Sequence, residues 1–518
     1  MKKITVSMIG RLPALFLFVF VFAINAFAFD KPTIPEELKY QPPVVPNEKN
    51  GLPLIEKAIE LYQPLNDVDQ QILLVDGLVV DKPWFNEEQQ AIFDQHVAKN
   101  APAFESLAAA VRLGEVKFEQ LFYSFKPVLR EMREIAEYRS RRLAMDGEWE
   151  SALESLILFL QLGEILRRSH HNAVIYMHGL GLQSQTALGL ARLAKQPAMP
   201  EALIERAIRQ IESAMPPDDD LPDLLRAEFH SFVVNAIVEI LPDNNNVEEV
   251  VRAVINRARP KKKLPVPTDP QAELDKRVEL VLSLLKDHPR AFDKDATMHL
   301  ASQLYLEALR NVSLPTAKWD TSVAEALSHD VQKWPEDASL QTMDMLAISL
   351  GHEQPDIPKK AIRKARNKLS KVDNVLGKHL LAEIDPYIPF VVNRHQKCAM
   401  IAWQTSMALC LFEERHGELP DSLQQLLDDD ILKRLPQDPF GDSLRYSRER
   451  KMLWSVGENA RDDGGVWEPD SYAMTQILGK MRPAGFPKLP SGPPATAERK
   501  DDLVFIIGKQ EKCDDSSK

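Results

Sequence analysis

The stretch "LPQDPFGDSLRYSRERKMLWSVGENARDDGG", Leu435–Gly465, predicts a small module of turns and strands in a chain whose pattern is otherwise mainly helical. Pro436 and Pro439 exclude a helix at its start, because proline lacks a backbone N–H and clashes with the preceding turn. The segments "SLRYS" and "KMLWSV" alternate in the manner of two short strands. "GENARDDGG" favours turns, because it is dense in Gly, Asn and Asp. Further on, "DDLVFII", 501–507, predicts a closing strand.

A long helix is expected directly before this module, over Ile388–His416, and Gly417 ends it. Asp421 is a favourable N-cap for a short helix that carries three leucines. Together these elements predict one α+β module over residues 388–518.

The order of these elements resembles the globular head of the major pseudopilins of type II secretion systems. In that family a long helix is followed by a G-x-x-P turn, a short helix, an L-P-x-D-P-[WF]-G turn, a small sheet and an acidic loop. The matching residues are Gly417, Pro420, Leu435, Pro436, Asp438, Pro439, Phe440, Gly441, Tyr446, Ser455, Val456 and Gly457. The resemblance implies a pseudopilin-like fold for less than a quarter of the chain.

The chain departs from that family at its beginning. A pseudopilin is processed at a Gly before an apolar helix with Glu at its fifth position. Here Gly10 is followed by Arg11, and the apolar stretch contains no Glu. About 35 residues also separate Gly465 from Asp501, more than the family pattern implies. We therefore expect a borrowed head fold and not a polymerising pilus subunit.

The family's acidic loop binds calcium, and the residues at this position suit that ion. Calcium takes roughly six to eight oxygen ligands from carboxylates, amides and main-chain carbonyls. The resemblance implies a calcium site formed by the carbonyl of Val456 and the side chains of Asn459, Asp462, Asp463 and either Asp501 or Asp502. A polar surface turn without metal is the alternative, since the spacing is not that of an EF-hand.

The first 28 residues have the layout of a secretory signal peptide. Lys2, Lys3 and Arg11 form a basic region, an apolar run follows, and Ala26-Phe27-Ala28 is a small-residue cleavage site. We expect cleavage after Ala28 and a periplasmic or secreted mature protein. An uncleaved anchor is the alternative, and only in that case is contact with a membrane expected.

The net charge argues against nucleic acid as a partner. The formal charge of the chain is −12, and loss of the signal, which carries three positive charges, lowers it to −15. Nonspecific nucleic-acid binding depends on clustered Lys and Arg, which such an acidic chain does not favour.

The remaining pattern predicts a mainly α fold, in which stacked helical hairpins, repeat-like or bundled, precede the small α+β pseudopilin-like module. The helices before the module include one that Gly147 ends and others over about 172–194 and 201–214. The expected order is a signal peptide 1–28, an extended leader 29–53, an N-terminal helical domain 54–256, a linker 257–270, a second helical region 271–387 and the module 388–518.

Over its whole length the chain also looks like exported helical bacterial proteins. The segments that carry this likeness are "NGLPLIEKA" near the start, "AMDGEWESAL" in the middle and the C-terminal module. The likeness implies an architecture and no activity.

We find no nucleophile, base and orienting group at a recognised spacing. The glycines of "GLGLQSQTALGLA", 179–191, lack the spacing of a nucleotide-binding or nucleophile-elbow motif. Close helix packing through Gly179, Gly181 and Gly189 is the better interpretation.

The three cysteines form no pattern of metal ligands. Cys398 and Cys410 lie 12 residues apart on one expected helix, which is roughly 18 Å and too far for a disulfide. Two alternatives stay open: either cysteine forms a disulfide with Cys513, or all three are free thiols.

These features favour an exported, non-enzymatic scaffold or adaptor that binds a protein partner. Its C-terminal module is expected to bind calcium and to associate with envelope secretion machinery. The alternative is a periplasmic hydrolase with its site in a helical groove, which requires a cleft holding convergent His and carboxylate side chains. A helical spacer that holds the module away from a membrane is a third possibility, and it requires an uncleaved N-terminus.

Overall fold

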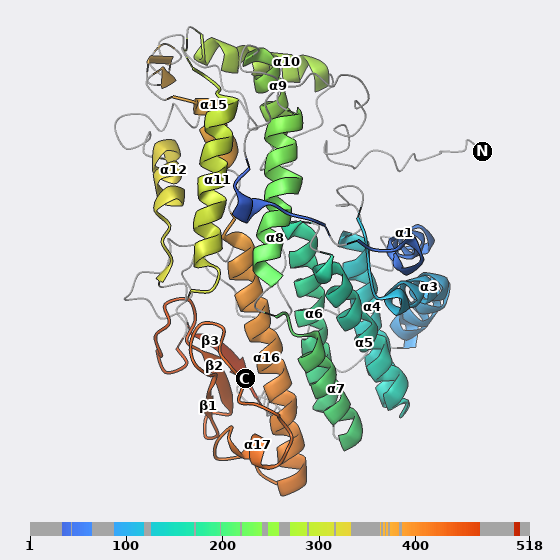
Figure 1. The fold of residues 1–518 in the computed structure, drawn as a ribbon. Helices are drawn as coiled ribbons and strands as arrows, with labels where there is room; N and C mark the ends of the chain where they lie inside the picture. Colours follow the sequence, from blue (N-terminus) through green and yellow to red (C-terminus); the bar gives the residue numbers. More distant parts are fainter. Residues whose placement is uncertain are drawn as a thin grey trace, which may run out of the picture. The chain divides into compact units, whose positions relative to one another are not determined.

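The computed structural model describes residues 34–42, 44–64, 87–118, 126–169, 172–196, 198–217, 220–240, 247–257, 270–286, 288, 290–314, 318–332, 363, 366–367, 369–370, 373–382, 386–466 and 502–507. These residues are mainly helical, with a small three-stranded antiparallel sheet (Figure 1). The predicted signal peptide, most of the predicted linker, Asp501 and Cys513 lie outside them.

The chain forms two compact units, each assembled from separate segments. One unit combines 1–40, 228–309 and 320–386, and the other combines 41–227, 310–319 and 387–518. The domain boundaries proposed from the sequence stay predictions.

The second unit contains the helices that surround the sites described below. Its elements are η2 (Asn47–Lys49), α1 (Leu52–Leu61), α3 (Glu87–Leu113), α4 (Lys126–Met145), α5 (Trp149–Arg168), α6 (Ala173–Ala194), α7 (Glu201–Ala214), α8 (Asp220–Glu228), α16 (Ile388–His416), α17 (Gln425–Asp428), β1 (Arg445–Ser447), β2 (Met452–Ser455) and β3 (Leu503–Ile506). The bounds of α7 and α16 are those expected from the sequence. Gly417 ends α16 with a φ of 77°, the left-handed conformation that favours glycine at a helix C-terminus.

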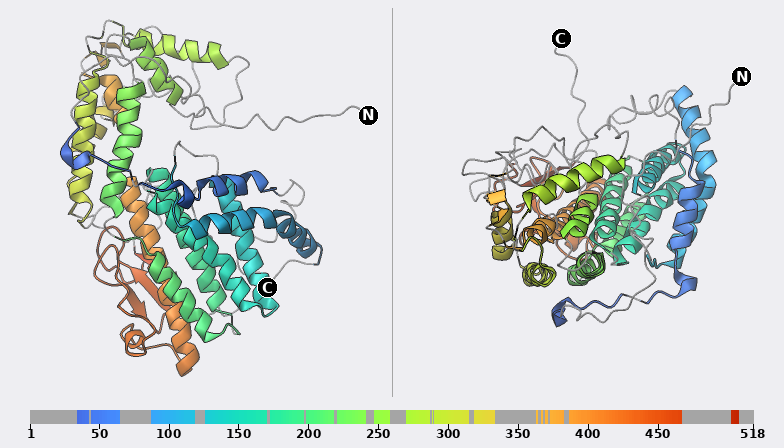
Figure 2. Two further views of the ribbon diagram at one scale, coloured as in Figure 1. Left: turned by 45° about the vertical axis from the view of Figure 1, so that its right-hand side comes forward. Right: turned by 90° about the horizontal axis from the view of Figure 1, so that it is seen from above.

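Two apolar cores meet at α5 and α6. One joins these helices to α1, α3 and α4, and it includes Phe104, Leu107 and Phe159. The other joins them to α7, α16 and the sheet, and it includes Leu156 and Leu453. Figures 1 and 2 show α16 between the sheet and the helices α6 and α7. The sheet is therefore part of the helical core of this unit.

Glycines allow α5 and α6 to cross at very short range. A Cβ atom on Gly163 would lie 2.6 Å from the Gly179 carbonyl oxygen, and one on Gly179 would lie 2.5 Å from the Gly163 carbonyl oxygen. The prediction of close packing is thus confirmed for Gly179. It is wrong for Gly181, where a Cβ would meet no described atom within 4 Å. A Cβ atom on Gly189 would make an ordinary van der Waals contact, 3.4 Å from Leu156 Cδ2.

The C-terminal sheet has the order β1-β2-β3, with both pairings antiparallel. Leu453 of β2 faces Tyr446 of β1 and Phe505 of β3. All three strands lie where the sequence predicts them. We call residues 418–466 together with 502–507 the cap.

The short helix of the cap begins later than expected. Asp421 is not its N-cap, because α17 starts at Gln425 after a turn. Asp421 instead accepts a hydrogen bond from Arg448, and its backbone N–H donates to the Gln425 side chain at 2.6 Å. An exposed arginine of the cap thus competes with the helix terminus for this carboxylate.

The first unit contains η1 (Glu36–Leu38), the π-helix η3 (Phe229–Ile240), α9 (Val247–Arg257), α10 (Pro270–Leu284), α11 (Lys294–Asn311), α12 (Ser322–Gln332) and α15 (Val375–Ala382). The fully buried carboxylate of Glu307 accepts the backbone N–H groups of Val323 and Ala324. A negative charge at this N-terminus satisfies donors that α12 itself leaves unpaired.

Among the residues described, no helix combines the length and apolar composition that crossing a bilayer requires. Cys398 is buried on α16 and Cys410 is partly exposed on the same helix, and the two are not bonded to each other.

Candidate functional site

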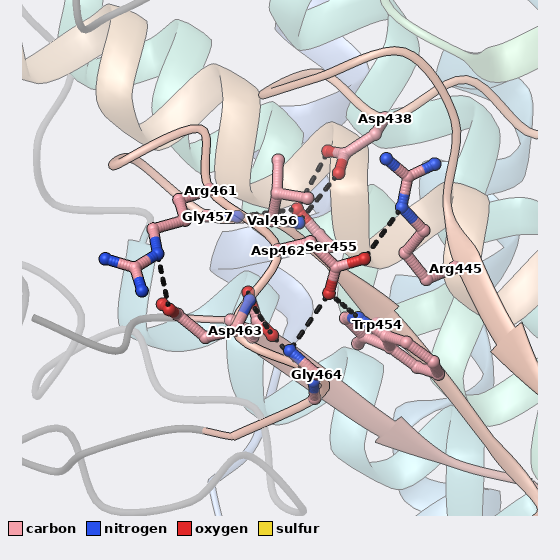
Figure 3. A network of polar contacts seen from close by, with 12 residues as sticks. Asp438, Arg445, Trp454, Ser455, Val456, Gly457, Arg461, Asp462, Asp463 and Gly464 are labelled. Atoms are coloured by element: carbon pink, nitrogen blue, oxygen red, sulfur yellow. Dashed lines mark hydrogen bonds and ion pairs between the residues drawn. The ribbon is translucent and has the colours of Figure 1, made fainter.

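Asp438 is the central polar residue of the cap. Its Oδ1 accepts from the Phe440 N–H at 2.9 Å. The same oxygen accepts from the Ser455 hydroxyl at 2.8 Å, and Oδ2 accepts from the Val456 N–H at 2.9 Å (Figure 3). The side chain is buried, and burial raises the pKa of Asp438, while these three donors act in the opposite direction. The carboxylate therefore ties the proline-rich turn to the end of β2.

The segment after β2, Val456–Val466, is the acidic loop singled out in the sequence. Asp462 Oδ1 accepts from Trp454 Nε1 at 3.0 Å, and its Oδ2 accepts from Arg445 Nε at 3.2 Å (Figure 3). Burial acts to raise the pKa of Asp462, but these donors and the Arg445 charge outweigh it and lower the pKa. The carboxylate thus holds the loop against β1 and β2.

The same loop lies directly on the outer face of β2. Gly465 has a φ of 70°, and a Cβ there would lie 2.3 Å from Met452 Cε and 3.3 Å from the Trp454 ring. A larger residue would displace these side chains. In this structure the loop therefore lies against the side chains of Met452 and Trp454.

Asp502 joins the acidic loop to the start of β3. Its carboxylate is fully buried and accepts the N–H of Asp463 at 3.1 Å and that of Gly465 at 2.7 Å. Burial raises the pKa of Asp502, and the charges of Asp463 and Asp462 raise it further against the two N–H donors. Two segments far apart in the sequence are joined through one carboxylate.

The structure brings some of the predicted calcium ligands together and separates others. Asn459 Nδ2 donates to Asp463 Oδ2 at 3.1 Å, whereas the Asp462 carboxylate faces Arg445 and Trp454. Asp501 lies outside the described residues.

The carboxylate oxygens of Asp462 and Asp502 already accept hydrogen bonds from the protein. In the described part of the chain, no three His, Cys, Asp or Glu side chains form a group able to hold a metal. Calcium binding at these residues stays a prediction, and it requires the Asp462 carboxylate to turn away from Arg445 and Trp454.

A second polar cluster, which the sequence did not predict, lies where the cap packs on α16. His395 and Cys398 are buried on α16. His395 Nε2 lies 3.6 Å from Glu458 Oε1, and its Nδ1 lies 2.8 Å from the Val391 carbonyl oxygen. Burial, with a smaller effect of Asp438, raises the pKa of Cys398 well above its ordinary value. A protonated, enclosed thiol is a poor nucleophile, so this cluster supports the cap.

A cavity of about 70 Å³ lies between α4, α5 and α6 in the helical core. Polar side chains from α4 and α6, among them Ser140, Arg141 and Arg192, form part of its wall. Trp149, Met145 and Leu156 form an apolar part. We call this space the arginine cavity.

Glu137 is the central charge beside the arginine cavity. Its Oε1 accepts from Arg141 and from Arg192 at 2.7 Å each, and its Oε2 accepts from Arg133 at 2.9 Å. Burial acts to raise the pKa of Glu137, but the three guanidinium groups outweigh it and lower the pKa to about 2. The ionised carboxylate therefore connects α4 to α6.

We expect Glu137→Gln to lower the free energy of unfolding at pH 7 by about 3 kcal/mol, since one pKa unit corresponds to about 1.4 kcal/mol. The pKa of Glu137 is lower in the folded protein than in the unfolded chain. This stabilisation is therefore complete above the ordinary pKa of 4.5 and is lost as the pH falls towards about 2. Urea unfolding between pH 7 and pH 3 measures it.

The difference in the free energy of unfolding between wild type and Glu137→Gln is expected to decrease as the pH falls from 7 to 3. Glu134→Gln is the matched control, because Glu134 is 37% exposed and its pairs at the surface are worth less than about 1 kcal/mol. Equal stability of wild type and Glu137→Gln at pH 7 would contradict the assignment.

Comparisons of the chain with protein-family models, with curated proteins and with solved structures gave no match. The likeness of the cap to a pseudopilin head therefore stays a proposal that its turn residues alone support.

Proposed function

We propose that this protein is an exported, non-catalytic adaptor that binds a protein partner through its cap. The observation that carries the proposal is the apolar core shared by the cap and the helical hairpins. Leu453 and Phe505 of the sheet belong to the same cluster as Leu156, Ile208 and Met407 of the helices. A partner bound to the cap is thus held by the α16 bundle with no flexible tether between them.

The contact surface we propose lies on β3. In the described sheet β3 is an edge strand, and Ile506 on it is 62% exposed. Val466, at the end of the acidic loop, is 39% exposed. Apolar side chains on an edge strand suit a partner that adds a strand or packs an apolar segment there.

Export and association with envelope secretion machinery are further parts of this proposal. The signal-like first 28 residues support export. The pseudopilin-like turn residues of the cap, including Asp438 and Gly441, support an envelope assembly as the setting.

Site-specific photocrosslinking tests the adaptor proposal. A photoreactive residue at Ile506 is expected to give a discrete crosslinked product in envelope fractions of cells that produce the full chain. Val44, which is 93% exposed and lies outside the cap, is the control position. Equal products from both positions, or none from Ile506, would argue against a partner site on β3.

The same crosslinking, repeated with calcium and with a chelator, tests the metal. If calcium fixes the acidic loop, the yield from Val466 rises with calcium and falls with chelator. An unchanged yield leaves the loop as a turn that its own hydrogen bonds hold.

A hydrolase is the second candidate function. The observation that favours it is the convergence of His395, Cys398, Asp438 and Ser455 at one place. Catalysis there requires the cap to open, because all four side chains are buried.

A further inference from the structure

The arginine cavity carries more positive than negative charge. Arg133, Arg141 and Arg192 all bind the single carboxylate of Glu137. The neighbouring Glu134 does not line the cavity, and its Oε1 lies 3.0 Å from Arg130 Nε and 3.7 Å from Arg133 Nη2. Among the residues that line the cavity itself, Arg141 and Arg192 carry positive charge and Glu137 carries negative charge.

A buried hydrogen-bond donor in the cavity wall also lacks an acceptor. Ser140 is 1% exposed and lines the cavity, and its hydroxyl has no hydrogen-bond partner among the described residues. Leaving a buried polar group unsatisfied costs roughly 1–3 kcal/mol. An acceptor in the cavity would relieve that cost.

The rest of the wall restricts the kind of acceptor. Trp149 and Leu156 are apolar, and Met145 is 51% exposed and brings one wall to the surface. The volume of about 70 Å³ is the room of two water molecules at roughly 30 Å³ each. A ligand group that fits is therefore small, anionic at one end and apolar at the other.

We propose that the arginine cavity binds the carboxylate of a small aliphatic acid. Its oxygens accept from the Ser140 hydroxyl and from the guanidinium groups of Arg141 and Arg192, and its carbon chain lies against Trp149 and Leu156. Arginine suits this role because its planar donors match the geometry of a carboxylate. The site is independent of the partner surface on the cap.

Calorimetric titration of the full chain with sodium acetate tests the proposal. Acetate is expected to bind, whereas acetamide and sodium chloride at the same ionic strength are not, because they lack a carboxylate. Wild-type protein that binds acetate no better than acetamide would overturn it.

Two variants report on the cavity itself. Ser140→Ala removes the unpartnered hydroxyl and is expected to weaken acetate binding about tenfold, the effect of one lost hydrogen bond to a charged group. Gly189→Ala adds a methyl group to the wall, 3.4 Å from Leu156 and 3.7 Å from Glu137 Cγ, and is also expected to weaken binding. Gly181→Ala on the same helix is the matched control, because the added methyl group meets no described atom within 4 Å.

Unchanged acetate affinity in both Ser140→Ala and Gly189→Ala would place the ligand elsewhere and overturn the proposal. Should Gly189→Ala fail to fold, Ser140→Ala still decides, since it removes only an unbonded oxygen.

A last titration arm separates two sources of the carboxylate. A short peptide with a free C-terminus displaces acetate if the site takes the end of another chain, and the same peptide with an amidated C-terminus does not. Absence of displacement by either peptide identifies a free small acid as the ligand.

Discussion

Alanine in place of Gly163 is expected to lower the free energy of unfolding by about 3 kcal/mol or more, the upper end of overpacking effects in cores. The new Cβ would lie 2.6 Å from the Gly179 carbonyl oxygen and 2.7 Å from Gln183 Cγ. The carbonyl is backbone, so relief requires α5 and α6 to move apart. The better helix propensity of alanine returns only about 1 kcal/mol.

Thermal unfolding followed by circular dichroism measures this effect. Each kcal/mol shifts the melting temperature by roughly 2–4 °C for 150–250 residues and by less for a unit as large as this one, so a drop of about five degrees is expected. Gly181→Ala is the control and should match or slightly exceed wild type, because nothing described lies within 4 Å of its Cβ position. A Gly163→Ala protein that melts with wild type would show that the two helices do not cross this closely.

Asp438→Ala is expected to destabilise the cap by about 2–4 kcal/mol. The change leaves three donors without their acceptor, namely the N–H groups of Phe440 and Val456 and the Ser455 hydroxyl. The cost of burying the carboxylate, which raises its pKa, offsets part of this loss. The expected loss of stability is therefore smaller than the summed free energies of three hydrogen bonds to a charged group.

Hydrogen exchange shows where that stability is lost. The Asp438→Ala protein should exchange the amides of Phe440 and Val456 much faster, while α4 and α5 keep wild-type protection. Asp442→Ala, in the same turn but exposed, is the control and should change stability by less than about 0.5 kcal/mol. Uniform destabilisation across the helices would contradict a role local to the cap.

Local signals in the sequence were sufficient to predict most elements of the cap and α16. Gly417 adopts the positive φ that its position after a helix implies. Pro436 and Pro439 exclude helix, and the alternating residues that follow form β1 and β2. The prediction that Asp421 is an N-cap is wrong. The N-cap preference of about 1 kcal/mol competes with a hydrogen bond from Arg448, whose position in space the sequence does not reveal.

The sites were harder to predict, because their partners come from distant segments. Arg133, Glu137 and Arg141 stand four residues apart on one helix, a spacing that indicates ion pairs. Nothing in that spacing reveals Arg192 of α6, which turns a surface pair into a buried network. Likewise, the Asp462 carboxylate can be assigned to a metal or to Arg445 and Trp454 only once the strands are placed.

The place of β3 in the core has a consequence for how this protein matures. A ribosome makes a chain from its N-terminus, so α6 and α7 are made long before α16, which packs on them, and before β3, which joins the same apolar core. Asn393 of α16 donates a hydrogen bond to the hydroxyl of Tyr176, which lies 217 residues earlier in the sequence. Phe505 of β3 is made later still and packs in the apolar core that contains α16. The apolar faces that α16 covers in the folded protein are therefore uncovered in the growing chain, and such transiently exposed surface favours aggregation.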